Sequence, residues 1–388
     1  MHQQSYRLFW PCMTWLTFLI VCSLVAFACG ARGSNWEDKR LVHVHAAAAD
    51  MPEEWRGYVR IGTEPLGTGN FGEAWLARDA SSNQQVVVKF FFVTGRPGVF
   101  LSPSTAILDD LQDARNECQA PRSILQETKF PTPNYVVDCI ANGVDDSERS
   151  YIVLEVAGSQ TLGQYMTDFH SRQTNVTARV RIYKVVAKML LEGLREFEGF
   201  YVHRDIKPAN IMVSKGTDGE PQDLKFIDWG LAVRENFSGL LAGDPDFLPP
   251  ETKPGDENMQ WGRTMDRFTF HARHDVYAVG EMLFSYVCQK EKESQPVTWR
   301  RRVKEEMIKD NRRQEMINYA LRKPWTKTFL EDCNTNLENE LLPLWELIKV
   351  MRLPISSTLE SQKLRPLASK ILVDFATLLE VKPNGQRE

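Results

Sequence analysis

The chain lacks an excess of positive charge. Its 47 lysines and arginines stand against 51 aspartates and glutamates, which leaves a formal net charge of −4. Proteins that bind nucleic acid usually present a basic face, so this balance argues against DNA or RNA as a partner. A local basic cluster begins at Trp299 and continues to Arg313 with a helical pattern. We interpret this cluster as a solvated helix face rather than as a docking site for acidic partners.

Regular cysteine spacing is also missing. Three of the seven cysteines lie in the first 29 residues, and the others, Cys118, Cys139, Cys288 and Cys333, follow neither a metal-ligand nor a disulfide-framework pattern. We therefore expect buried thiols at these four positions. No third ligand stands near His43 and His45, so this pair favours a linker over a metal site. Internal repeats and low-complexity tracts are absent, which excludes a repeat architecture.

The first 31 residues carry a pattern typical of protein targeting. An uncharged apolar run from Met13 to Cys29 follows Arg7 and contains the small-residue cleavage pattern Ala26-Phe27-Ala28. This order predicts a secretory signal peptide at residues 1–31. Counted from Leu8 the run is long enough to cross a bilayer, so a signal anchor through residues 8–29 is the alternative. A third alternative is an incorrect N-terminal gene model.

The flanks of this leader bear on topology and location. Basic residues lean to its C-terminal side, which would place the remainder of the chain in the cytosol if the leader stays in the membrane. Residues 32–56 have the composition of a linker. The sequence thus predicts a protein of the secretory pathway, either secreted or held by a single membrane span. Two sequons, at Asn175 and Asn236, would accept glycans only there.

The stretch from His203 to Asn210 contains the most informative set of reactive side chains in the sequence. It reads His-Arg-Asp-Ile-Lys-Pro-Ala-Asn and places a carboxylate, an ammonium and an amide within eight residues. Phosphoryl transfer needs such a set: a base that orients a hydroxyl, a cation on the moving phosphate and a neutral ligand for Mg²⁺. The string resembles the catalytic loop of the eukaryotic protein kinases, and Lys207 matches the serine/threonine branch.

Other motifs follow in the order of that family. Residues 67–72 read Gly-Thr-Gly-Asn-Phe-Gly, a loop in which glycines bring backbone N–H groups close to phosphates. Lys89 lies in an apolar strand, where a charge is costly without a partner. The resemblance supplies that partner as a helix glutamate, for which we expect Glu117, in a helix from Leu108 to Leu125; Glu127 is the rival.

Asp228-Trp229-Gly230 stands where the family usually has Asp-Phe-Gly. It resembles the same variant in casein kinase II and is compatible with catalysis. Residues 243–251 resemble the end of the family's activation segment, with Asp244 in place of the usual threonine. A carboxylate there would pair with Lys207 but repel Asp205. Downstream, Asp275 resembles the residue that accepts backbone N–H bonds from the catalytic loop.

The resemblance implies an α+β, two-lobed kinase fold, with a β-rich N-lobe at 57–153, a hinge at 154–157 and a helical C-lobe at 158–381. Residues 382–388 would be a tail. Arg365 is the expected buried partner of Glu251, as a bidentate pair. The leader makes the chain similar to secreted or membrane-anchored kinases of apicomplexan parasites.

The implied activity is transfer of the ATP γ-phosphoryl group, with Mg²⁺, to serine or threonine hydroxyls of a protein substrate. The alternative is a pseudokinase that acts as a binding or allosteric scaffold. The resemblance assigns the catalytic positions to Asp205, Lys207, Lys89 and Glu117, and the metal ligands to Asn210 and Asp228. It assigns nucleotide contacts to Gly67, Thr68, Gly69, Asn70, Phe71, Gly72, Lys89, Leu154, Glu155 and Ala157.

Overall fold

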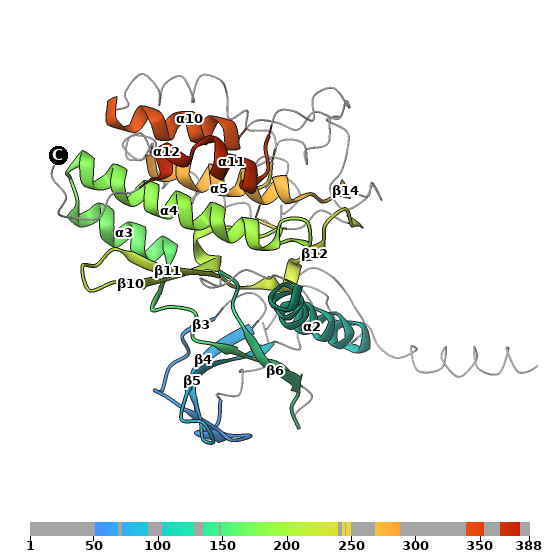
Figure 1. Cartoon of the computed structure of the whole chain (residues 1–388). Coiled ribbons are helices and arrows are strands. Elements are labelled where there is room, and N and C mark those ends of the chain that lie inside the picture. Colours follow the sequence, from blue (N-terminus) through green and yellow to red (C-terminus); the bar gives the residue numbers. More distant parts are fainter. Residues whose placement is uncertain are drawn as a thin grey trace, which may run out of the picture. The chain divides into compact units, whose positions relative to one another are not determined.

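The structure is a computed structural model, and it describes residues 51–68, 72–91, 103–127, 135–146, 149–239, 243–244, 246–249, 268–287, 339–352 and 365–380. For residues 103–113 it describes the backbone alone. The predicted leader, the basic cluster at 299–313 and the tail at 382–388 lie outside these residues. The described chain combines an N-terminal sheet and one long helix with a mainly helical C-terminal part, as the α+β prediction requires (Figure 1).

The N-terminal part is an antiparallel sheet with the strand order β1-β2-β4-β5-β7-β6, and β3 pairs with β4. Its first strand precedes residue 57, so the folded sheet begins inside the segment that the sequence predicted to be a linker. Met51 and Trp55 explain this, because both pack into the core of the sheet. The strands are β1 (Glu54–Trp55), β2 (Tyr58–Arg60), β3 (Gly67–Thr68), β4 (Gly72–Asp79), β5 (Gln85–Phe91), β6 (Cys139–Val144) and β7 (Ser150–Glu155).

Strand alternation places the lysine of β5. Successive side chains of a strand point to opposite faces, and in β5 the residues Val86, Val88 and Phe90 are buried in the small aromatic core beside Trp75. Lys89 therefore points to the other face. That face lies against the helix of the N-terminal part, so the register of the strand brings the ammonium group to the helix.

That helix is α2 (Pro103–Glu127), which contacts β6 and β7. It begins five residues before Leu108, although the sequence Ser102-Pro103-Ser104 by itself is typical of a loop. Proline is well tolerated in the first turn of a helix, where its missing N–H has no intrahelical acceptor. The side chains of Cys118, Ala120 and Ile124 are buried on the face of α2 that joins the main core.

The C-terminal part is built around α4 (Val176–Phe197). The apolar residues between positions 176 and 198 recur with a helical period, which predicts a helix there. The buried face of α4 repeats with helical period and packs on α5 (Ala272–Val287) and α11 (Ala368–Asp374) (Figure 1). The other elements are α3 (Leu162–Arg172), α10 (Leu342–Met351), α12 (Ala376–Leu379), β8 (Gln160–Thr161), β9 (Tyr201–Val202), β10 (Ile211–Lys215), β11 (Pro221–Phe226), β12 (Val233–Arg234), β13 (Ser238–Gly239) and β14 (Phe268–Thr269).

The end of the chain differs in detail from the sequence prediction. The apolar-periodic stretch from Pro366 to Leu379 predicts one helix. The structure has two short helices there, α11 and α12, that meet at Phe375. Arg365 is only 1% exposed; it donates to the carbonyl of Arg273 at 3.2 Å, and its guanidinium lies 4.7 Å from the centre of the Tyr277 ring. Its predicted partner, Glu251, lies outside the described residues, so that pairing stays a prediction.

The prediction of buried thiols is wrong for two cysteines, because Cys118 of α2 and Cys139 of β6 form a disulfide. Spacing alone could not reveal this, since the two cysteines are 21 positions apart and their approach depends on how α2 packs on β6. Within the described residues no helix has both the length and the apolar character needed to cross a membrane.

Candidate active site

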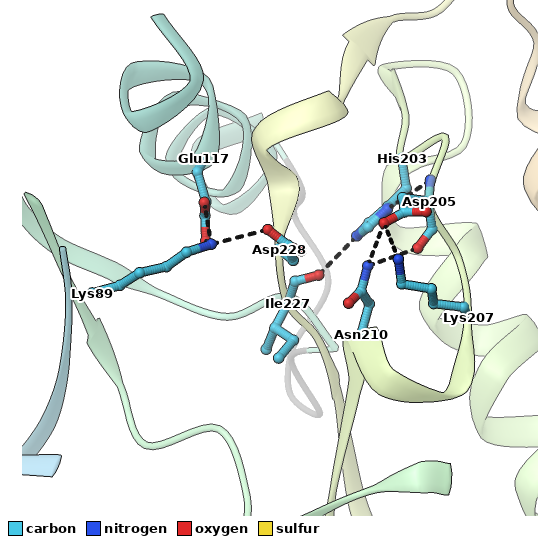
Figure 2. A network of polar contacts seen from close by, with 8 residues as sticks. All are labelled: Lys89, Glu117, His203, Asp205, Lys207, Asn210, Ile227 and Asp228. Atoms are coloured by element: carbon cyan, nitrogen blue, oxygen red, sulfur yellow. Dashed lines mark hydrogen bonds and ion pairs between the residues drawn. The ribbon is translucent and has the colours of Figure 1, made fainter. Parts of the chain in front are cut away.

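Lys89 lies between two carboxylates that come from distant parts of the chain. Its Nζ donates to both carboxylate oxygens of Glu117 at 2.8 Å and to Oδ1 of Asp228 at 3.0 Å (Figure 2). The predicted pair of Lys89 with Glu117 is therefore present. The rival, Glu127, instead meets Arg234 at an exposed position. The contact with Asp228 joins the N-terminal sheet to the C-terminal part.

Charge and burial act in opposite directions on the pKa of Lys89. Burial alone would lower the pKa of the Lys89 ammonium, but the charges of Asp228 and Glu117 outweigh it and raise that pKa above its ordinary value. The charge of Lys89 in turn holds the pKa of Asp228 below its usual range. Lys89 and Asp228 thus stabilise each other's charged forms, and two carboxyl groups face one ammonium group. Such a cluster favours the approach of a further cation.

Asp205, the predicted catalytic carboxylate, lies at the centre of a second set of polar contacts (Figure 2). Its Oδ2 accepts from Nζ of Lys207 at 2.7 Å and from Nδ2 of Asn210 at 2.8 Å. Its Oδ1 accepts the backbone N–H of Asp244 at 2.9 Å. Three donors from both sides therefore fix the orientation of a carboxylate that is only 6% exposed.

His203 and Asp275 anchor the loop behind that carboxylate. The Asp275 carboxylate accepts the backbone N–H of His203 at 2.7 Å and that of Arg204 at 3.1 Å, which confirms the role expected for Asp275. Nε2 of His203 is 3.0 Å from the carbonyl of Ile227, and its Nδ1 accepts the N–H of Asp205 at 3.3 Å. These partners match a neutral imidazole with the proton on Nε2, and burial lowers the pKa of His203 accordingly.

Trp229 follows Asp228 in the chain and lies beside His203 of the catalytic loop. It is fully buried, packs edge-on against Phe197 and lies against His203, and its indole N–H donates to the carbonyl of Phe226 at 3.0 Å. Asp228 precedes it with a φ of 65°, an uncommon conformation for a residue other than glycine. The buried indole holds that turn in place, and the turn aims the Asp228 carboxylate at Lys89.

Asp228 and Asn210 supply oxygen ligands of the kind that Mg²⁺ prefers. Because Nδ2 of Asn210 donates to Asp205, its amide oxygen is turned away from that carboxylate and remains an acceptor (Figure 2). One carboxylate and one amide oxygen suit an ion that keeps several water or phosphate ligands. The donor set therefore fits the metal that the sequence suggested.

The predicted nucleotide-contact residues are described in part. Gly69, Asn70 and Phe71 lie outside the described residues. Gly67 and Thr68 are exposed on β3, and Gly72 opens β4 where a Cβ would lie 2.0 Å from the Phe90 carbonyl, so only glycine fits. Leu154 and Ala157 are buried where β7 ends.

The side chain of Glu155 has a partner that the sequence did not suggest. It accepts from Lys225 at 2.7 Å and from the backbone N–H of Asp138 at 2.8 Å. It therefore links β7 to β11 and is held away from any ligand, so a nucleotide contact at this position would involve the backbone.

An open pocket of about 520 Å³ lies beside Lys207, and sequence reasoning missed it. It is formed by the start of α3, the catalytic loop and the segment around Asp244; its lining residues are Thr161, Gly163, Gln164, Thr167, Asp168, Lys207, Pro208, Ala209, Asp244 and Phe247. Helix α3 begins there with a capping box between Thr161 and Gln164. Its lining includes Lys207, whose Nζ pairs with the Asp205 carboxylate, so the pocket lies one side chain away from that carboxylate.

Comparison with known proteins adds family information to this geometry. Residues 61–373 match the protein kinase domain family. The chain is 30% identical over 209 residues to Serine/threonine-protein kinase Aurora-1 of Arabidopsis thaliana, which covers 53% of this chain and 61% of that protein. It is 28% identical over 213 residues to an Aurora kinase of Schizosaccharomyces pombe, covering 53% of this chain and 52% of that protein.

A bacterial kinase is similar to the chain at a comparable level of identity. Serine/threonine-protein kinase PksC of Streptomyces coelicolor is 29% identical over 228 residues, which is 57% of this chain and 36% of that protein. The chain spans less than two thirds of the length of each of these three relatives.

Proposed function

Since the chain belongs to the eukaryotic protein kinase superfamily, serine/threonine type, we propose that it transfers the γ-phosphoryl group of ATP to serine or threonine hydroxyls of a protein substrate. The observation that carries this proposal is the contact of Lys89 with both Glu117 and Asp228. It brings a phosphate-binding cation and a metal ligand within 3.0 Å of each other, at the junction where a nucleotide would lie.

Each polar group has a role in this proposal. Asp205 orients the substrate hydroxyl and accepts its proton, and Lys207, hydrogen-bonded to Asp205, carries positive charge to the transferring group. Asn210 and Asp228 hold Mg²⁺, which when bound neutralises negative charge that builds up on the phosphate oxygens. Lys89 positions the nucleotide phosphates and Glu117 keeps it in place. Groups held by several hydrogen bonds need little reorganisation during the reaction, which favours catalysis.

The nucleotide would lie under the loop at residues 67–72, with backbone N–H groups directed at its phosphates. Its base would contact the buried side chains of Leu154 and Ala157 and the backbone at Glu155. The substrate peptide would enter the open pocket beside Lys207.

A pseudokinase is the second candidate, and Asp244 is the observation that favours it. Asp244, which lines the pocket together with Lys207, carries a carboxylate where the family usually has a threonine. A scaffold would retain the fold and the nucleotide site without transferring phosphate.

One assay separates the two. The full chain is purified from cells, whether or not these have cleaved its leader, and is incubated with [γ-³²P]ATP, Mg²⁺ and a generic protein substrate. The variant Asp228→Ala is treated in the same way as a control. We expect incorporation of ³²P into serine and threonine by the wild type and none above background by the variant. Equal incorporation by both, or none by either when both bind a fluorescent ATP analogue, would favour the scaffold.

We also propose that the protein enters the secretory pathway through residues 1–31. The Cys118–Cys139 disulfide supports this, since disulfides persist mainly in oxidising compartments. Asn175 and Asn236, which begin the two sequons, are both exposed. N-terminal sequencing of protein from eukaryotic cells should find residues 1 to about 28 removed, or find an intact leader in the membrane fraction. A full-length product in the cytosolic fraction contradicts both.

A further inference from the structure

The disulfide lies next to the active-site glutamate along the chain. Cys118 directly follows Glu117 on α2, and Cys139 is the first residue of β6. The two Cα atoms are 5.2 Å apart, within the range that an unstrained disulfide requires. Both residues are almost fully buried, at 1% and 2% exposure. The covalent link therefore fixes α2 to the sheet one residue from the carboxylate that holds Lys89.

The other contacts that hold this part of α2 are non-covalent. Arg122, one turn further on, donates to the carbonyls of Cys139 and Ile140 at 2.7 Å, and Ile124 packs in the core. The Arg122 contacts end at the same strand as the disulfide. If the helix moved away, Glu117 would leave Lys89, and one partner of a buried ion pair would be left uncompensated. The position of α2 thus controls the charge balance at Lys89.

We propose that Cys118 and Cys139 are a redox modification site, at which thiol–disulfide exchange sets the activity of the enzyme through the position of Glu117. The oxidised form holds Glu117 on Lys89 and is the active one. The reduced form releases α2 to sample positions in which Lys89 lacks one carboxylate. This inference rests on the proposed function, because its readout includes phosphoryl transfer.

A low-molecular-weight disulfide such as oxidised glutathione serves as the oxidant in this exchange. The thiolate of one cysteine attacks a sulfur of this disulfide, forms a mixed disulfide and releases one glutathione thiolate. The second cysteine then attacks the protein sulfur of the mixed disulfide and displaces the second glutathione thiolate. Two protein thiols and one external disulfide thereby become one protein disulfide and two external thiols; a dithiol reductant reverses the reaction.

Because Cys118 and Cys139 are buried, the rate of thiol–disulfide exchange should depend on the state of the active site. A reductant reaches the sulfurs only when α2 moves from β6, and that motion also separates Glu117 from Lys89. A ligand that requires the Lys89–Glu117 pair should therefore slow reduction, since coupling between two sites is reciprocal. This second readout does not depend on phosphoryl transfer.

The test compares the oxidised and reduced full chain. The protein is treated with oxidised glutathione or with dithiothreitol, and peptide mapping after alkylation reports the state of Cys118 and Cys139. We expect the oxidised form to contain the linked peptides and reduction to lower kcat/KM for ATP at least fivefold. We also expect saturating ATP analogue to slow reduction of this disulfide at least threefold.

Variants control for other thiols and for folding. Cys118→Ser and Cys139→Ser should behave like the reduced wild type and should not respond to dithiothreitol, whereas Cys288→Ser should respond as the wild type does. If the serine variants do not fold, the wild-type comparison still decides.

Two results would overturn the proposal: equal kcat/KM in the two redox states, or free alkylatable thiols at both positions after oxidation. An oxidised protein that transfers no phosphate, yet is protected from reduction by the ATP analogue, would contradict the proposed kinase activity and leave the coupling intact.

Discussion

Asp244 donates its backbone N–H to Oδ1 of Asp205 at 2.9 Å, so the residue that replaces a threonine supports the central carboxylate through its main chain. Its own carboxylate accepts the N–H of Asp246 at 3.1 Å and is thereby turned along the activation segment. The expected ion pair with Lys207 is not the contact that forms, because Lys207 pairs with Asp205 instead. The bond from the Asp244 amide opposes the repulsion that two nearby carboxylates would otherwise exert.

The Asp244 carboxylate nevertheless leaves a negative charge at the pocket mouth, since Lys207 and Asp205 offset each other. We predict a preference for peptides with lysine or arginine within two residues of the phosphate acceptor. Asp244→Asn keeps the backbone donor and an acceptor for Asp246 but removes the charge. We expect it to raise KM for a basic peptide about fivefold and to change KM for a neutral peptide less than twofold. Steady-state kinetics on matched peptides measure this, and an equal effect on both peptides would exclude the preference.

Removal of the Lys89 ammonium should abolish phosphoryl transfer. We expect Lys89→Met and Asp228→Asn each to lower kcat/KM by at least a hundredfold, because each removes a group held for phosphate or metal. Thermal unfolding of both variants accompanies the kinetics. Turnover at the wild-type rate in either variant would remove the corresponding residue from the site.

We also expect the Lys89→Met variant to be less stable than the wild type. Lys89→Met leaves Glu117, whose side chain is 2% exposed, without its cation, and breaking a buried pair in this way typically costs about 3–5 kcal/mol. The double variant Lys89→Met/Glu117→Gln removes both charges. We expect it to regain most of the lost melting temperature and none of the activity. If activity returned with stability, the loss in the single variant would be one of folding.

Phosphorylation of Ser238 should not be required for activity. Its hydroxyl lies 2.8 Å from that of Thr269, across the short pair of strands β13 and β14. The resemblance to protein kinases implies that Arg204 would meet a phosphorylated residue of the activation segment. Arg204 is instead largely buried, with its guanidinium 4.2 Å from the Phe270 ring centre, and burial lowers its pKa to about 10. Phosphatase-treated enzyme and Ser238→Ala should keep more than half of the activity. A large loss in both, reversed by rephosphorylation of Ser238, would indicate a conventional switch.

Acid should destabilise the protein partly through His274. Burial, together with the charges of Arg365 and His271, lowers the pKa of His274 to about 3 from 6.5. Between these values the unfolded chain binds a proton that the folded protein excludes. The free energy of unfolding therefore falls as the pH falls from 6.5, by up to about 1.4 kcal/mol per pH unit from this group.

The variant His274→Gln isolates that contribution. Nδ1 of His274 accepts the N–H of His271 at 2.9 Å, and glutamine offers an acceptor in its place. The neighbouring Asp275 acts in the opposite sense, because burial raises its pKa to about 7, and it is present in both proteins. Below pH 6.5, the slope of the free energy of unfolding against pH, measured by urea unfolding between pH 4.5 and 7.5, should thus be lower in the variant than in the wild type by up to about 1.4 kcal/mol per pH unit. Identical slopes would show that His274 titrates alike in both states.

The contacts among the candidate site residues were easier to predict from the sequence than the bounds of the elements that surround them. Lys89, Asp205, Asn210 and Asp228 each sit in a short motif whose spacing is set by a strand or a tight loop, so their approach follows from the motifs. Glu117 needed one further assumption, the face that α2 turns to the sheet, and its choice over Glu127 came from the family resemblance.

What the sequence could not predict depends on tertiary packing. The disulfide of Cys118 with Cys139 requires knowledge of where α2 meets β6. The role of Asp244 was misjudged because a side chain can be read from the sequence, whereas the direction of a backbone N–H cannot. The early start of α2 at Pro103 was missed because the proline suggested a loop.

Trp229 also bears on inhibition by small molecules. A compound that occupies the space behind the Asp228 turn has to expel a fully buried indole and leave its N–H and the Phe226 carbonyl without partners. An unsatisfied buried group costs about 1–3 kcal/mol, and emptying the site of a large aromatic side chain costs about 3–5 kcal/mol. Inhibitors that compete within the nucleotide cleft should therefore bind this protein far better than inhibitors that need the tryptophan displaced.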